Sequence, residues 1–262
     1  MAGSSSSFIS WLGPGFAFSF GLVWGSFVNV VIHRLPRGKF LDSTRSRCPA
    51  CGEIVAAYDN VPVLSFLFLG GRCRYCKARI SFRYPVVELA VGCASLLAYL
   101  RHGPTLECVV ELAFVAATVA LVFIDYEHQI LPNSITIPGI LAGLALSLLR
   151  DTISIRDSAL GALLGAGLLF VVAELYFRLR GIEGLGFGDV KMMGMVGAFL
   201  GWKGVFLTLF LGSFAGSVVG GFVLARGGDM QTKLPFGTFL GAGAIVALYS
   251  GTRLIGWYSG LF

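Results

Sequence analysis

The sequence predicts an all-α protein that crosses a membrane several times. Its residues are 56% hydrophobic and only 13% charged, whereas about a quarter of the residues in a typical soluble domain are charged. Apolar runs recur along the chain at about the 20-residue length that a helix needs to cross hydrocarbon. Because backbone polar groups inside a bilayer must be satisfied within their own segment, we expect these runs to be helices. The 36 glycines suit helices that pack closely in lipid.

We expect about eight transmembrane helices, joined by short connections except after the first. The first helix occupies residues 11–32 and is followed at once by Arg34, Arg37 and Lys39. The remaining spans are expected at residues 84–100, 108–124, 134–149, 157–177, 190–202, 204–225 and 235–257. This divides the chain into a first transmembrane helix (1–32), a cytosolic loop domain (33–83) and a membrane-embedded core (84–262).

The basic residues predict the orientation of these helices. Charges directly after the first span place the N-terminus outside and the long loop in the cytoplasm. The remaining spans then put most of the 20 lysines and arginines, Lys233 among them, on the cytoplasmic side. The net charge of +6 therefore indicates loops that face anionic lipid headgroups, and we expect no nucleic-acid partner for a loop tethered to the membrane.

The long loop contains two cysteine pairs, Cys48-Pro49-Ala50-Cys51 and Cys73-Arg74-Tyr75-Cys76, in the spacing C-x2-C-x21-C-x2-C. Two thiolate pairs at this spacing are typical of a closed tetrahedral zinc site. Reduced thiols or two disulfides are the alternatives, but disulfides are rare in the cytoplasm. Four cysteine ligands leave no position for water, so we expect a structural zinc rather than a catalytic one.

Two aspartates lie at span ends that the topology places on the cytoplasmic side. Asp125 closes the third span, where the negative end of the helix dipole disfavours a carboxylate. Asp189 opens the sixth span, where aspartate also serves as an ordinary N-cap. If the two carboxyl groups meet, one keeps a proton, and the pair offers both a general base and a general acid. The base activates water and the acid protonates the leaving amine, which is peptide hydrolysis without a covalent intermediate. Gly186 and Gly188 would let an extended substrate approach the backbone closely.

These residues carry a family resemblance. Gly186-Phe187-Gly188-Asp189 resembles the GxGD signature of membrane aspartyl proteases. The chain as a whole resembles the type IV prepilin peptidase family through four blocks in order: Gly25 to Pro36, the tetracysteine loop, Asp125-x5-Leu131-Pro132, and Gly188-Asp189-Val190-Lys191. Arg83 to Glu88 is similar to a further block of that family, which makes Glu88 a candidate for orienting the site.

The resemblance implies a bifunctional enzyme of the bacterial inner membrane. Such an enzyme cuts the short basic leader of prepilins and pseudopilins after a glycine at the cytoplasmic face, in type IV pilus or type II secretion systems. It then methylates the new N-terminal residue with S-adenosylmethionine. Asp125 and Asp189 match the catalytic aspartates, with Gly186, Gly188 and Lys191 in support. Asn133 stands where many relatives have another acid, although Glu127 is nearby.

S-adenosylmethionine binding follows from the resemblance alone, because the chain has no βαβ unit with a GxGxxG turn. The residues named as candidates for binding it, in or facing the cytosolic loop, are Asn29, Asp59, Asn60 and Gly71. Glu111 and Glu174, which lie inside expected spans, receive no role.

Two other functions remain open at this stage. An ion-coupled transporter with a zinc-ribbon regulatory loop would also place acids in a membrane, but it predicts acids near the midplane and inverted repeats. A non-catalytic assembly factor would dock pilins through the basic loop and would tolerate asparagine in place of both aspartates.

Overall fold

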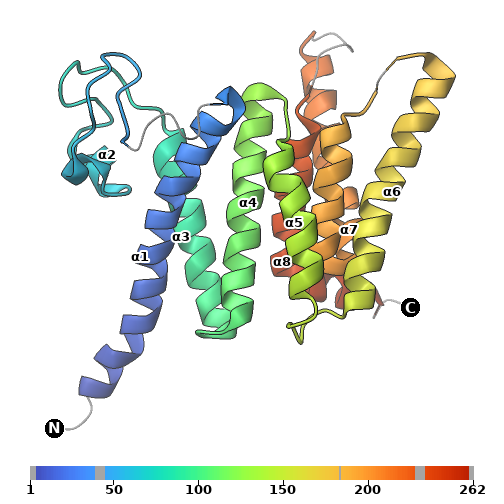
Figure 1. Cartoon of the computed structure of the whole chain (residues 1–262), viewed down its shortest axis with the longest axis horizontal. Helices are drawn as coiled ribbons and strands as arrows, with labels where there is room; N and C mark the ends of the chain where they lie inside the picture. Colours follow the sequence, from blue (N-terminus) through green and yellow to red (C-terminus); the bar gives the residue numbers. More distant parts are fainter. Residues whose placement is uncertain (1–3, 39–44, 183, 228–233, 260–262) are drawn as a thin grey trace. The chain divides into compact units, whose positions relative to one another are not determined.

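The computed structural model describes residues 4–38, 45–182, 184–227 and 234–259, and within them the regular structure is helical. Lys39 and Lys233, which entered the predicted charge distribution, lie outside the described residues. The helices, in chain order, are α1 (Ser4–Arg34), η1 (Leu35–Arg37), η2 (Ala57–Asn60), α2 (Leu64–Phe68), α3 (Arg83–His102), α4 (Leu106–His128), α5 (Asn133–Leu146), α6 (Ile155–Arg180), α7 (Phe187–Ala225) and α8 (Phe236–Ser259) (Figure 1).

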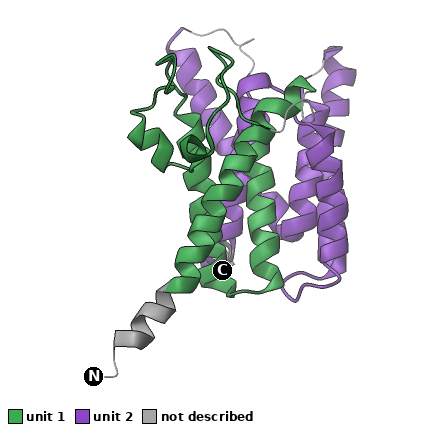
Figure 2. Cartoon of the chain, turned by 60° about the vertical axis from the view of Figure 1, so that its left-hand side comes forward, with its two compact units in different colours: residues 1–120 green, residues 121–262 purple. Residues whose placement is uncertain are grey.

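The chain forms two compact units, residues up to 120 and residues from 121 on, so that α4 contributes to both (Figure 2). Among the described residues, five helices are long and apolar enough to cross a membrane: α1, α3, α4, α6 and α7. The shorter apolar helical stretches are Asn133–Leu146, which is α5, and Phe236–Gly251, which is part of α8. The prediction of an all-α polytopic fold is confirmed, and the chain is a multi-pass membrane protein.

Helix α7 is two helical arms that meet at Gly201. This residue has φ 70° and ψ 179°, a conformation that favours glycine. A Cβ atom built on Gly165 of α6 would lie 2.2 Å from Met193 O and 3.3 Å from Val205 Cγ2. In a straight helix Met193 and Val205 would be about 18 Å apart, so the chain must double back at Gly201. This reversal explains why the sequence predicts two spans, 190–202 and 204–225, where the structure has one kinked helix.

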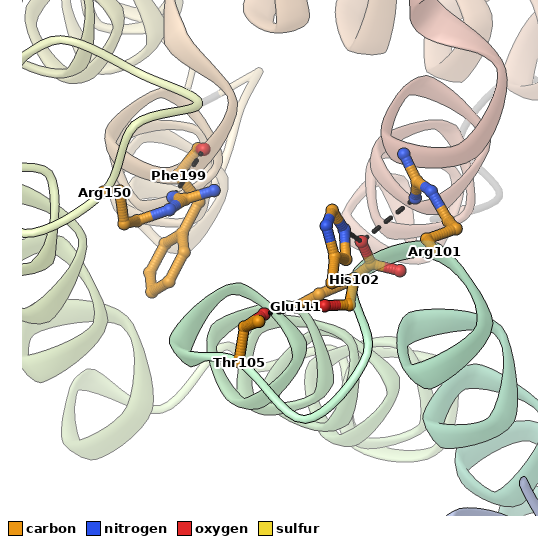
Figure 3. A network of polar contacts seen from close by, with 6 residues as sticks. All are labelled: Arg101, His102, Thr105, Glu111, Arg150 and Phe199. Carbon is orange, nitrogen blue, oxygen red and sulfur yellow. Dashed lines mark hydrogen bonds and ion pairs between the residues drawn. The ribbon is translucent and has the colours of Figure 1, made fainter.

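The carbonyl groups at the end of the first arm of α7 find partners on neighbouring segments. Ser158 Oγ donates to Ala198 O at 2.7 Å. The Arg150 guanidinium donates to Phe199 O at 3.3 Å, as the close-up of Figure 3 shows. A helix end leaves carbonyl oxygens without helical partners, and these two bonds satisfy them beside the reversal.

Glycines bring helix backbones into direct contact in both units. A Cβ on Gly197 of α7 would lie 2.0 Å from Gly161 O of α6, and one on Gly25 of α1 would lie 2.7 Å from Glu88 Cα of α3. No larger residue fits at these crossings without moving a helix, which is the packing that small residues allow in membranes.

Candidate active site and metal centre

Asp125 lies in the last turn of α4 and is only 5% exposed. Its Oδ2 atom accepts a hydrogen bond of 2.7 Å from the backbone N–H of Thr238, in the first turn of α8. The Thr238 hydroxyl is 3.1 Å from the same oxygen and 3.2 Å from Val122 O, so it donates to one of them at a time. The Asp125 carboxylate is therefore held by uncharged donors.

Asp189 lies in the first turn of α7 and is 8% exposed. Its backbone N–H donates to Gly186 O at 3.1 Å. Its Oδ1 atom is buried and has no hydrogen-bond partner among the described residues. A Cβ on Gly186 would lie 3.2 Å from Asp189 Oδ2, so the glycine at this position leaves room for the carboxylate.

The structure brings the two aspartates together at one end of the second unit. A Cβ on Gly237 would lie 3.0 Å from Asp125 Oδ2 and 2.9 Å from Leu131 Cδ1. A Cβ on Gly188, next to Asp189, would lie 2.8 Å from Leu131 Cβ. Leu131 thus lies against Gly237, beside Asp125, and against Gly188, beside Asp189. Two acids that are distant along the chain share one site.

The other residues predicted around the aspartates support the backbone. The Lys191 ammonium group donates to Asn133 Oδ1 and so ties the first turn of α7 to the first residue of α5. The Asn133 side chain is thereby tied to Lys191. Glu127 Oε2 is 3.9 Å from His128 Nε2.

Sequence reasoning missed Gly237 and Thr238. A threonine at the start of an apolar span is usually an ordinary cap or turn residue. The signal that would have found them is their position at the start of a span that begins on the same side as Asp189.

The four predicted zinc ligands come together in the first unit. All four cysteine Sγ atoms lie within 4.8 Å of one another, and Cys48 Sγ is 3.8 Å from Cys76 Sγ. Tetrahedral coordination at a Zn–S distance of about 2.3 Å requires sulfurs about 3.8 Å apart. The cysteines are free thiols rather than disulfides, so the donor set fits a metal ion.

The two cysteine pairs sit in matching turns. Cys48 N–H donates to Glu53 O and Gly52 N–H donates to Cys48 O, and Cys73 N–H and Lys77 N–H make the same bonds with Ala78 O and Cys73 O. Short bridges, Arg47 with Ile54 and Arg72 with Arg79, close the two turns. The backbone N–H groups of Cys51 and then Ala50 lower the pKa of the Cys48 thiol, whereas burial and hydrogen bonds from the neighbouring cysteines raise the pKa of the Cys51 thiol.

Four residues are predicted as candidates for cofactor binding. Each either contacts another part of the protein or is exposed. Asn29 of α1 is 2% exposed and donates from Nδ2 to Tyr84 O at 3.0 Å. Asp59 accepts two bonds from Arg74, at 2.6 and 2.7 Å, and the Arg74 hydrogen bonds hold the Asp59 pKa below its usual range. Asn60 is exposed at the end of η2, and Gly71, with φ 66°, packs on the Phe66 ring. The contacts join none of the four to another, so no donor set for S-adenosylmethionine follows from them.

The remaining acids of the spans have structural partners. Glu88 Oε2 accepts from Val63 N–H at 2.8 Å. Glu111 Oε2 accepts from Arg101 at 3.0 Å and pairs with His102 Nε2 at 2.9 Å (Figure 3). Glu174 pairs with Arg178 one turn later on the exposed side of α6, at 2.7 Å.

A polytopic helical protein in which two acids meet beside a Gly-x-Gly-Asp turn has the arrangement of a membrane aspartyl protease. Comparison with known sequences identifies the family. Residues 19–102 match the family model described as the bacterial peptidase A24 N-terminal domain, and residues 112–221 match that of the type IV leader peptidase family. The chain belongs to the type IV leader peptidase family.

Its relatives match over most of the chain. A protein of Burkholderia pseudomallei is 38% identical over 263 residues, covering 90% of this chain and 85% of the relative. One of Aeromonas salmonicida is 35% identical, covering 95% of each chain, and one of Myxococcus xanthus is 43% identical, covering 82% of this chain and 65% of the relative. All three are named prepilin leader peptidase/N-methyltransferase. No solved structure gives a significant match.

Proposed function

We propose that this protein cuts the leader from type IV prepilins and pseudopilins after a glycine and then methylates the new N-terminal residue. Relatives that are 35–43% identical carry the name of this double activity. The single observation that carries the proposal for the protease is the meeting of Asp125 and Asp189 at one end of the second unit. Neither the family nor the structure supports the transporter alternative.

Asp125 and Asp189 are the proposed catalytic residues. Two carboxyl groups that share a site hold one proton between them, because both cannot ionise cheaply. The ionised group takes a proton from water, whose oxygen attacks the scissile carbonyl carbon. The protonated group gives its proton to the nitrogen of the peptide bond, which then breaks. The Thr238 donors suit Asp125 as the ionised base, and the unpartnered Asp189 Oδ1 suits the acid.

The residues around the aspartates position the turn and the substrate. Gly186 leaves space beside Asp189 Oδ2, and we assign it and Gly188 to the close approach of an extended leader. Lys191, through Asn133, holds the first turn of α7 against α5. These three residues act on position rather than on the proton transfers.

We place the active site at the cytoplasmic face and the N-terminus outside. The basic residues between α1 and α3 support this orientation, because such residues favour the cytoplasmic side. The division into a first span (1–32), a tetracysteine domain (33–83) and a membrane core (84–262) belongs to the same proposal. Prepilin leaders would then reach the aspartates from the cytoplasm.

The tetracysteine cluster is proposed to hold a structural zinc ion through Cys48, Cys51, Cys73 and Cys76. Zinc in a closed site contributes folding free energy and no catalysis. The methyl group is proposed to come from S-adenosylmethionine.

Mass spectrometry of a purified pilin N-terminus tests both activities. The full chain in lipid nanodiscs, supplied with prepilin and S-adenosylmethionine, should release a cut product that is one methyl group heavier than the bare cut form. Asp125→Asn and Asp189→Asn should leave the leader attached. Full cleavage by either variant would contradict the proposed protease mechanism. A product of the wild-type chain that is cut but unmethylated would contradict only the proposed methyltransferase activity.

A further inference from the structure

The tetracysteine domain exposes a group of large apolar side chains. Four of them form what we call the α2 patch: Leu64, Leu67 and Phe68 of α2, and Phe82. Their exposed fractions are 52%, 66%, 89% and 76%. Exposed apolar side chains of this size, three of them on one face of α2, are typical of an interaction site.

The α2 patch lies at the level of a membrane span. The ring of Phe66, in α2, is 5.3 Å from that of Phe82, and Phe82 directly precedes Arg83, where the span α3 begins. Val63 N–H, at the start of α2, donates to Glu88 Oε2 at 2.8 Å. Glu88 is about 7 Å along α3 from its first residue. Helix α2 is therefore fixed beside the first turns of α3 rather than above them, and Figure 1 shows it there.

The bend that holds α2 in this place is strained. Val63 has φ 61° and ψ −50°, which is unfavourable for a β-branched residue. The bond to Glu88 compensates for this conformation. Ser65 Oγ accepts from Val61 N–H and donates to Tyr58 O, at 3.0 and 2.9 Å. The direction of α2 is thus fixed by buried polar contacts on one side, which leaves its apolar side outward.

Basic residues follow the patch in the chain and lie close to it. Gly71 packs on the ring of Phe66, and exposed Arg72 comes next and is bridged to exposed Arg79. Arg83 lies at the start of α3. Apolar side chains at the depth of a span, bordered by arginines, match the boundary between acyl chains and anionic headgroups.

We propose that the α2 patch inserts into the lipid leaflet on the side of the tetracysteine domain. Leu64, Leu67, Phe68 and Phe82 contact acyl chains about 5–10 Å below the headgroups, and Arg72 and Arg79 contact lipid phosphates. The loop between α1 and α3 is then a membrane-seated domain, held by lipid as well as by its two flanking helices. The inference rests on the membrane fold and not on the proposed catalysis.

Tryptophan quenching in nanodiscs tests the insertion. Phe68→Trp is compared with Tyr75→Trp, whose parent side chain is 57% exposed between Cys73 and Cys76. The signal of the wild-type chain with its 4 tryptophans is subtracted from each. With lipids brominated on the acyl chain, the added emission of Phe68→Trp should be quenched at least about twofold more than that of Tyr75→Trp. Equal quenching, or a Phe68→Trp emission typical of water, would overturn the proposal.

Two further measurements keep the result decisive. Zinc content and circular dichroism of each variant must equal those of the wild-type chain, and Leu67→Trp replaces Phe68→Trp if the latter fails. If brominated lipid does not quench the Phe68→Trp emission but added prepilin shifts its wavelength, the patch binds the substrate and the lipid proposal is wrong. If the emission wavelength shifts only with protein concentration, the patch binds a second copy of the chain, and the lipid proposal is again wrong.

Discussion

Asp59 and Glu111 of the first unit are partnered differently from Asp125 and Asp189 of the second unit. In the first unit, Asp59 pairs with Arg74 at 2.6 Å, and Glu111 pairs with both Arg101 and His102. Both carboxylates are therefore held by side chains that carry or can carry a positive charge.

In the second unit, neither candidate catalytic acid has a charged partner among the described residues. Asp125 accepts from the backbone and hydroxyl of Thr238, and Asp189 Oδ1 accepts nothing. Asp125, Asp189 and Glu111 are all nearly buried, at 5%, 8% and 6% exposed. Burial therefore does not distinguish the two candidate catalytic acids from Glu111, whereas the charged partners of Glu111 do.

The largest effect should come from removing either acid of the second unit. Asp125→Asn and Asp189→Asn should each slow prepilin cleavage by about a thousandfold or more, because one member of the acid–base pair is lost. Thermal unfolding in detergent should change little, since no ion pair is broken. Cleavage rates from gel densitometry, read beside melting curves, check both. A large fall in melting temperature together with a normal cleavage rate would show that these acids stabilise the fold and do not act in catalysis.

Removing a partnered acid of the first unit should have the opposite outcome. Glu111→Gln should lower the free energy of unfolding by about 1–3 kcal/mol, a value reduced because the Arg101 side chain is 38% exposed. The cleavage rate per folded molecule should remain within about twofold of the wild type. Denaturation in mixed micelles and a cleavage assay measure the two quantities.

The matched control is Glu174→Gln, which breaks an exposed pair on α6. Its stability should change by less than about 0.5 kcal/mol. If Glu111→Gln abolished cleavage while remaining folded, the division between structural and reactive acids would be wrong.

A smaller effect should follow from changing the donors to Asp125. Thr238→Ala keeps the backbone N–H bond of 2.7 Å and loses the hydroxyl. Cleavage should fall by about tenfold, which corresponds to one hydrogen bond to a charged group. Thr238→Ser should restore it, and the pH profile of the rate should move in the alanine variant. An unmoved profile would make Thr238 a packing residue.

The smallest effect should be at the exposed pair of the tetracysteine domain. Asp59→Asn should change zinc affinity by less than about threefold, because Arg74 is 47% exposed and its attraction is screened. Chelator competition measures the affinity, with Cys73→Ser as the reference variant that should lose zinc. A loss in Asp59→Asn as large as that in Cys73→Ser would show that the ion pair holds the metal turns together.

Much of this arrangement could be predicted from local patterns. A helix in lipid must satisfy its backbone within its own segment, so the apolar runs alone indicate α3, α4 and α6 to within a few residues, and α1 except for its first turns. The tetracysteine site is also local, because C-x2-C fits one turn and each pair forms its own turn. The catalytic role of Asp125 and Asp189, in contrast, remains a prediction that cleavage assays must test.

The partners of the acids depend on tertiary structure, because they come from helices that are distant in the chain. Thr238 reaches Asp125 across 113 residues and Glu88 reaches Val63 across 25, and no periodicity predicts either bond. The sequence does predict separate spans on the two sides of Gly201, and the structure adds that Gly165 packs against both arms of α7. Composition and spacing determine which segments enter the membrane, since that choice depends on each segment's own transfer free energy. Whether a buried acid is neutralised or left able to exchange a proton depends on which side chains the packed helices place beside it.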